Sequence, residues 1–169
     1  MIALKNVLVA TDFSEPSATA LEYGRALART FNASLHVLHV VDNVFAQAML
    51  ADAAPANYAG LLQEIEESGR KQLEAIVRED DRRELHATPV LLTYTGPAAG
   101  IVSYAKQRDV DLIVMGTHGR AGFSHVLMGS VAEKVVRSAP CPVLTVRHPE
   151  HEFISPDALQ VAGHAGKPA

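Results

Sequence analysis

The sequence predicts an α/β fold: a single domain with a three-layer open sheet of five mostly parallel strands and helices on both faces. Five runs of strand length are rich in Val, Ile and Leu, and segments with helical spacing separate them. The strand runs are continuously apolar rather than alternating with polar residues. This pattern is typical of parallel strands that helices cover on both faces.

Length and composition fit one compact domain. The chain has 169 residues, of which 48% are hydrophobic, and this suits a single core. We assign residues 1–147 to a nucleotide-binding domain, for reasons given below, and residues 148–169 to a C-terminal tail. The tail has few apolar anchors, so both a mobile tail and a partly ordered appendage remain open.

Charge and apolar patterning exclude several classes of function. The chain carries 15 Lys and Arg against 19 Asp and Glu, so no nucleic-acid partner is expected. Apolar runs are too short for a membrane span, and the first residues lack the pattern of a secretory signal. We therefore expect a cytoplasmic protein without a membrane partner. The lone Cys141 is expected to be a buried structural thiol.

The first third of the chain predicts a β-α-β unit. Residues 4–10 form a buried strand that ends at Thr11-Asp12. Ser14 is a suitable N-cap and Pro16 a suitable first-turn residue for a helix that runs to about Phe31. A second strand is expected over residues 35–41.

The middle of the chain predicts a long helix and a third strand. Apolar residues from Tyr58 to Ile76 mark one face of the helix. The charged run Arg78 to Glu84 is interpreted as its solvated end, with an interaction patch as the alternative. Residues 88–94 form the third strand, and Pro97 begins the next helix after the turn at Gly96.

The last predicted elements surround a glycine-rich connection. The fourth strand, residues 112–115, leads into Gly116 and Gly119, and Gly129-Ser130 opens a short helix. The fifth strand covers residues 143–146, so five strands alternate with four helices. Glycines after a buried strand, followed by a helix N-terminus, favour a cradle of backbone N–H groups around an anion.

These segments are expected to meet at one edge of the sheet. In an open parallel sheet, ligands bind beyond the carboxyl ends of the strands, where the winding reverses. Asp12, Val41 and the glycine loop all emerge there. A carboxylate suits a sugar hydroxyl or a cation, an apolar residue suits a base ring, and the glycines suit phosphate. The site therefore fits a nucleotide.

Four motifs make the chain resemble the universal stress proteins, in their single-domain, ATP-binding form. They are Val7-Leu-Val-Ala-Thr-Asp12, Thr95-Gly-Pro97, Met115-Gly-Thr-His-Gly-Arg120, and Gly129-Ser-Val131 through Pro140-Cys-Pro-Val-Leu-Thr-Val146. The resemblance covers roughly residues 1 to 147. It implies a Rossmann-like fold, similar to that of adenine nucleotide hydrolases.

The resemblance also implies a ligand, ATP with Mg²⁺ or Mn²⁺, and the residues that hold it. Adenine and ribose would lie against Ala10, Thr11, Asp12 and Val41, with Val40 as a one-residue alternative to Val41. The phosphates would lie against Met115, Gly116, His118, Gly119, Gly129, Ser130 and Val131. No metal site made by the protein alone is expected, although Asp12 could contact a metal ion through Mg-ATP.

Simpler interpretations remain for some of these residues. Asp12 is also suited to capping the following helix, and Gly116 and Gly119 to plain turns. His36 and His39 are expected to share one face of their strand. No third ligand follows at metal-site spacing, so we interpret both as structural.

The motifs favour binding over catalysis. The chain has no Walker-type loop, kinase catalytic loop or Ser-His-Asp arrangement, so no catalytic residue is assigned. We expect an ATP-binding, nucleotide-dependent stress-response or signalling module with an unknown protein partner. The alternatives are a slow Mg-dependent ATPase and a nucleotide-independent dimeric adaptor.

A homodimer is expected through the fifth strand, Val143, Leu144, Thr145 and Val146. An exposed sheet edge is prone to aggregation unless it is covered, and the resemblance implies pairing there, because family members commonly dimerise through this strand.

Overall fold

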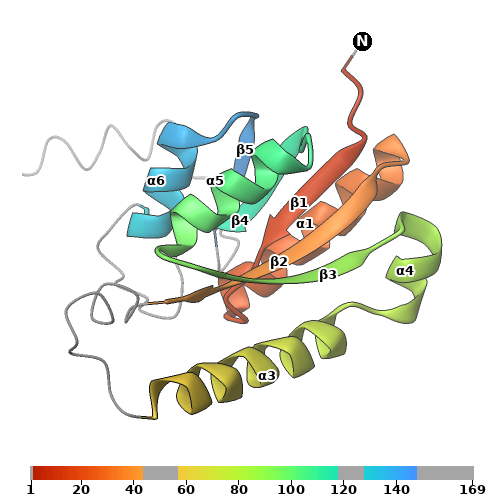
Figure 1. The fold of residues 1–169 in the computed structure, drawn as a ribbon. Helices are drawn as coiled ribbons and strands as arrows, with labels where there is room; N and C mark the ends of the chain where they lie inside the picture. The colour runs from red at the N-terminus through yellow and green to blue at the C-terminus, as the bar shows by residue number, and fades with distance from the viewer. Residues whose placement is uncertain (1, 44–56, 118–127, 148–169) are drawn as a thin grey trace, which may run out of the picture.

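The computed structural model describes residues 2–43, 57–117 and 128–147. One five-stranded sheet has the order β3-β2-β1-β4-β5, and all of its recorded strand pairs are parallel. The predicted α/β sheet is therefore confirmed (Figure 1). The strands are β1 (Asn6–Ala10), β2 (Ser34–Asp42), β3 (Thr88–Tyr94), β4 (Leu112–Gly116) and β5 (Val143–Val146).

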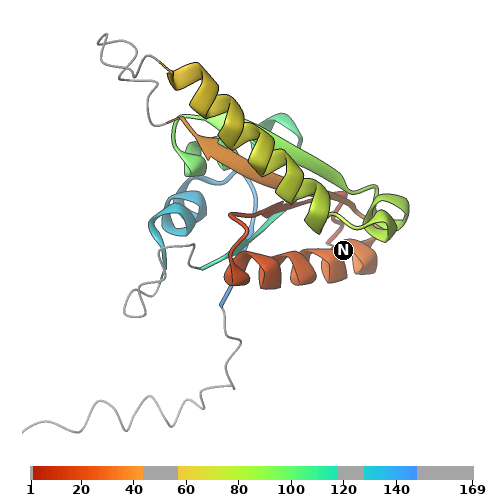
Figure 2. The same cartoon turned by 90° about the horizontal axis from the view of Figure 1, so that it is seen from below.

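Helices cover both faces of this sheet, as the continuous apolar strands predicted. One face packs against α1, α3 and α4, and the other against α5 and α6. Figure 1 shows α3 and α5 on opposite sides of the sheet, and Figure 2 shows α3 and α1 on the face seen from below. The helices are α1 (Glu15–Phe31), α3 (Tyr58–Ile76), α4 (Glu79–Leu85), α5 (Pro97–Gln107) and α6 (Ser130–Ser138).

The central strand β1 supplies both halves of the core by alternation. Val7 and Val9 pack toward α1, whereas Leu8 and Ala10 pack toward α5 and α6. Val7, Leu8 and Val9 are fully buried. Gly24 allows α1 to approach β1, because a Cβ at residue 24 would lie 2.3 Å from Val9 Cγ2.

The charged run after α3 is not a solvated helix end, so that prediction is wrong. Helix α3 ends before Val77, and residues 79–85 form the separate helix α4. The described residues therefore contain five helices, whereas four were predicted. Asp81 on α4 is 1% exposed and faces Arg25 on α1, which is 2% exposed. The Arg25 Nη2 to Asp81 Oδ2 distance is 2.7 Å, and Nε lies 3.0 Å from each carboxylate oxygen.

The two histidines of β2 lie on opposite faces of the sheet, which also corrects our expectation. His36 Nδ1 lies 2.9 Å from the Tyr104 hydroxyl of α5, whereas His39 packs beside Gly69 of α3. Residues three apart in a strand point in opposite directions, so the two imidazoles cannot share a ligand.

The strand order determines where a ligand site can form. β1 continues to β2 and β3 on one side, and β4 and β5 lie on the other side. The winding therefore reverses between β1 and β4, and the carboxyl ends of these strands flank a crevice. Within the described ranges, no helix has both the length and the apolar character needed to cross a membrane.

Candidate functional site

A cavity of about 380 Å³ opens at the carboxyl ends of β1 and β4, at the predicted position. Its volume falls within the range of small-molecule sites in proteins. Most of the sequence-predicted site residues meet on its wall: Ala10, Thr11, Asp12, Met115, Gly116, Gly129, Ser130 and Val131. His118 and Gly119 lie outside the described residues.

At β2, the cavity wall is formed by Val40 and not by Val41. Val40 packs with the core on the α5 side and lines the cavity, while Val41 is buried without lining it. Because side chains alternate along a strand, adjacent residues face opposite layers. The β2 residues that line the cavity are Leu38, His39 and Val40, so the alternative assignment, Val40, is the one that reaches this cavity.

Asp12 occupies the tight turn between β1 and α1. Its Oδ1 accepts hydrogen bonds from the Ser14 backbone N–H at 3.1 Å and from the Ser14 hydroxyl at 2.5 Å. Ser14 is the N-cap of α1 by backbone position, with Pro16 in the first turn, but its side chain bonds Asp12 rather than the helix. The carboxylate is thereby fixed at the cavity wall by its own turn.

Thr11 anchors this turn to the neighbouring strand. Its N–H donates to the Leu38 carbonyl at 2.9 Å, and its hydroxyl lies 3.1 Å from the Ser17 hydroxyl. Its carbonyl lies 2.8 Å from His39 Nδ1. A carbonyl can only accept, so Nδ1 carries the proton of this hydrogen bond.

The opposite wall is built where β4 meets the start of α6. The Thr117 N–H donates to the Val146 carbonyl at 2.8 Å, and the Gly129 N–H donates to the Thr117 carbonyl at 2.7 Å. These bonds bring the N-cap of α6, Gly129, beside the end of β4. The first N–H groups of a helix have no acceptor within the helix, and they form its positive end. This wall therefore suits an anion.

An apolar wall lies between these polar ends. Leu38 and Val40 come from β2, and Pro97 and Ile101 come from the first turns of α5. Sequence analysis did not assign seven of the residues that line the cavity to the site: Ser17, Leu38, His39, Pro97, Ile101, Thr117 and Ala132. A signal was present, since Pro97 begins the helix that follows the carboxyl end of a strand, and such helices border the crevice of a parallel sheet.

The electrostatics of the cavity rest on few groups. Among the described residues that line it, Asp12 is the only carboxylate and none is Lys or Arg. Within residues 2–43, 57–117 and 128–147, no group of three His, Cys, Asp or Glu side chains could hold a metal ion. In this part of the chain, positive potential for an anion comes from the α6 N-terminus.

Comparisons with known proteins agree with this architecture. The model of the universal stress protein family matches residues 3–147. Universal stress protein MJ0531 of Methanocaldococcus jannaschii is 31% identical over 148 residues, which cover 88% of this chain and 85% of the relative.

Solved structures extend the agreement to the fold. That of MJ0577, also from M. jannaschii, has a TM-score of 0.72 and 26% identity, covering 89% of this chain and all of the other. The Archaeoglobus fulgidus universal stress protein in complex with dAMP has a TM-score of 0.58 and covers 86% of this chain and 99% of the other. At 24% identity, that likeness concerns the fold alone. The chain belongs to the universal stress protein family.

Proposed function

We propose that this protein binds ATP, together with Mg²⁺ or Mn²⁺, in the cavity between β1 and β4, and that nucleotide occupancy controls a role in stress response or signalling. The observation that carries the proposal is the convergence of three chemically distinct walls on one cavity. They are the Asp12 turn, the apolar surface around Val40, and the N-terminus of α6.

Each wall suits one part of an adenine nucleotide. The adenine ring fits the apolar surface of Val40 and Ile101, beside Ala10 and Thr11. The ribose fits the Asp12 end, because a carboxylate accepts hydrogen bonds from sugar hydroxyls. The phosphates fit the α6 end, where Ser130 adds a hydroxyl donor and Gly116 and Gly129 leave the backbone accessible.

Four further residues complete the proposed phosphate end. Met115 and Val131 border it on the cavity wall. His118 and Gly119, which the sequence assigns to the same loop, are proposed to contribute a side-chain donor and a backbone approach. A divalent cation would neutralise phosphate charge, and Asp12 is the carboxylate positioned to contact it. The A. fulgidus relative was solved in complex with dAMP, which supports an adenine nucleotide as the ligand class.

The described cavity residues favour holding a nucleotide over transforming it. Rapid phosphoryl transfer relies on several positioned charges, including a Lys or Arg. The described lining supplies Asp12 and a helix N-terminus instead. We therefore assign a binding role, in which the bound and empty states differ in their affinity for a protein partner.

The identity of the ligand is directly testable. Protein purified rapidly without added nucleotide is denatured, and the released small molecules are identified by mass spectrometry. We expect ATP or ADP at a substantial fraction of one equivalent, and a marked loss in Asp12→Ala. The matched control, Asp80→Ala, removes an exposed carboxylate from α4. Absence of any nucleotide, with no thermal shift on adding Mg-ATP, would contradict the proposal.

We also propose a homodimer through β5. This strand is last in the sheet order and pairs only with β4 in the described chain. Ile113 and Thr117 donate to the carbonyls of Pro142 and Val146. Because parallel strands direct alternate residues to one neighbour, the backbone groups of Val143 and Thr145 face the outer edge. That edge is suited to pairing with a second copy.

The dimer has a simple test at that edge. Thr145→Pro removes an outward N–H, so sedimentation should change from dimer to monomer, while the circular dichroism spectrum stays unchanged. A dimer that survives in the folded variant would show that β5 is not the interface.

A further inference from the structure

We propose that His39, which also lines the cavity, is a positioning residue of the nucleotide site: its imidazole holds, from the α3 side of the sheet, the turn that presents Asp12 to the cavity. The inference rests on the proposed nucleotide-binding function. It gives a specific role in the site to a residue that sequence analysis interpreted only as structural and to which the family comparison assigns no role. Three observations converge on the His39 imidazole.

The first observation is the conformation of the turn. Phe13 has a φ of +66°, in the left-handed region that bulky side chains rarely adopt. Such a backbone persists only when its surroundings hold it. One stabilising contact lies within the turn itself: the Phe13 N–H donates to the Thr11 hydroxyl at 3.0 Å. The turn that carries Asp12 is thus one that needs outside support.

The second observation is a double contact of His39 with this turn. The Nδ1–H group donates to the Thr11 carbonyl, and the imidazole packs on the Phe13 ring with 4.4 Å between the ring centroids. The Thr11 carbonyl belongs to the peptide unit that enters Asp12, so this hydrogen bond orients the Asp12 backbone. His39 therefore contacts the turn on both sides of Asp12, at Thr11 and at Phe13.

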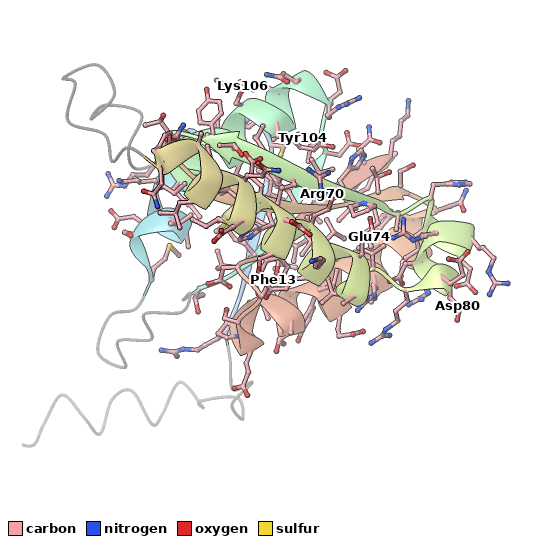
Figure 3. The ribbon with its side chains drawn as sticks, turned by 60° about the horizontal axis from the view of Figure 1, so that its bottom comes forward. Phe13, Arg70, Glu74, Asp80, Tyr104 and Lys106 are labelled. Atoms are coloured by element: carbon pink, nitrogen blue, oxygen red, sulfur yellow. The ribbon has the colours of Figure 1, made fainter. Side chains whose placement is uncertain are left out.

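The third observation is the support behind the imidazole. Gly69 of α3 lies so close that a Cβ there would be 3.2 Å from His39 Cδ2 and 2.9 Å from Leu91 Cδ1. Figure 3 shows Phe13 on the side of the sheet that α1 and α3 cover. A continuous series of contacts thus runs from Gly69 through His39 to Phe13 and the Asp12 turn.

Two substitutions at residue 39 separate the hydrogen bond from the ring contact. His39→Asn keeps an N–H donor near the position of Nδ1 and loses the ring, whereas His39→Phe keeps a ring and loses the donor. We expect His39→Phe to raise the Kd for Mg-ATP about tenfold, on the order of one lost hydrogen bond, and His39→Asn to raise it much less. Titrations well below the melting temperature make the Kd independent of global stability.

A second pair of variants tests the same series of contacts from α3. Gly69→Ala would press on the imidazole and should weaken Mg-ATP binding, although residue 69 does not line the cavity. Gly60→Ala is the matched control on the same helix, because a Cβ there meets nothing within 4 Å. It should leave the Kd unchanged.

Hydrogen exchange in the nucleotide-free protein tests the turn itself. The Phe13 and Ser14 amides are hydrogen-bonded within the turn, so they should exchange slowly in the wild type and about tenfold faster in His39→Phe. Unchanged exchange in that variant would overturn the proposal. So would faster exchange with a wild-type Kd for Mg-ATP, or equal loss of affinity in His39→Asn and His39→Phe. A wild type that binds no nucleotide would contradict the proposed function instead, and the exchange rates would still decide whether His39 holds the turn.

Discussion

Asp81 connects three elements through one buried carboxylate. It pairs with Arg25 of α1 and accepts the Arg78 backbone N–H at 3.0 Å. Arg25 also donates to the Ile76 carbonyl at the end of α3. Burial disfavours the charged carboxylate, but the hydrogen bonds from Arg25 and Arg78 outweigh it and hold the pKa of Asp81 below its ordinary value. The group therefore fixes the α3–α4 corner against α1.

Removing this carboxylate should be costly at neutral pH. Asp81→Ala leaves the buried Arg25 guanidinium with only the exposed Glu22 as an ion-pair partner, so we expect a loss of about 3–5 kcal/mol in the free energy of unfolding, measured by urea denaturation at pH 7. The control Asp80→Ala removes a carboxylate whose ion pair with Arg83 is exposed, and it should cost less than about 1 kcal/mol. Equal losses in the two variants would contradict this assignment.

We also expect the destabilisation caused by Asp81→Ala to depend on pH. The pKa of Asp81 is lower in the folded chain than in the unfolded chain. Its stabilisation is thus complete above the unfolded value of about 3.9 and is lost as the pH falls through the lower folded value. The difference in unfolding free energy between wild type and Asp81→Ala should therefore narrow below about pH 4. A difference that stays constant from pH 7 to pH 3 would contradict the assigned pKa direction.

Residue chemistry was predictable where the chain itself carries the signal. Asp12 follows a buried strand, and Gly116 and Gly129-Ser130 have a recognisable spacing. The β2 residues that meet the cavity were harder to predict, because Leu and Val occur on both faces of this strand and do not show which residues face α5. Asp81 was not predictable either. Its partner Arg25 lies 56 residues away, and nothing in a charged run marks which member is buried.

At the scale of elements, α1 depends on close packing at Gly24. Gly24→Ala places a Cβ 2.3 Å from Val9 Cγ2, at the centre of the sheet. We expect a loss of about 1–3 kcal/mol in the free energy of unfolding, despite the higher helix propensity of Ala. Gly60→Ala, in open space on α3, should instead be neutral or stabilising by up to about 1 kcal/mol. Thermal or urea unfolding would check both, and equal stability of the two variants would contradict the packing account.

The start of α6 makes a separate prediction for binding. Ser130 is the first residue of the helix and lines the cavity, so Ser130→Ala should raise the Kd for Mg-ATP about two- to tenfold by removing a hydroxyl donor. Ser138→Ala, at the other end of α6, removes a hydroxyl away from this cavity and should leave the Kd unchanged. Fluorescence competition with a labelled nucleotide would measure both. No change in Ser130→Ala would exclude its hydroxyl as a ligand donor.

Elements that are bounded by Gly or Pro residues in the sequence were predicted well. The third strand was expected over residues 88–94 and spans Thr88–Tyr94, and the following helix begins at Pro97 as expected. The break between α3 and α4 was missed, because tertiary packing causes it. Val77 and Leu85 both enter the core, and this requires the chain to turn between them.

At the scale of the whole molecule, the sheet order joins fold to function. Continuous apolar strands predicted parallel pairing, and the reversal between β1 and β4 predicted the position of the cavity. Ligand binding there should stabilise the entire domain, since a nucleotide that contacts β1, β2, β4 and α6 binds only the folded state. At a Mg-ATP concentration of 100 times the Kd, we expect a gain of about 2.7 kcal/mol and a rise in melting temperature of roughly 5–10 °C.

Calorimetric titration of nucleotide-free protein with Mg-ATP tests the central claim most directly, when wild type, Asp12→Ala and Asp80→Ala are compared. We predict one nucleotide per chain for the wild type, at least about tenfold weaker binding for Asp12→Ala, and unchanged binding for Asp80→Ala. Absence of binding by the folded wild type, or equal affinity in all three proteins, would contradict a nucleotide site between β1 and β4.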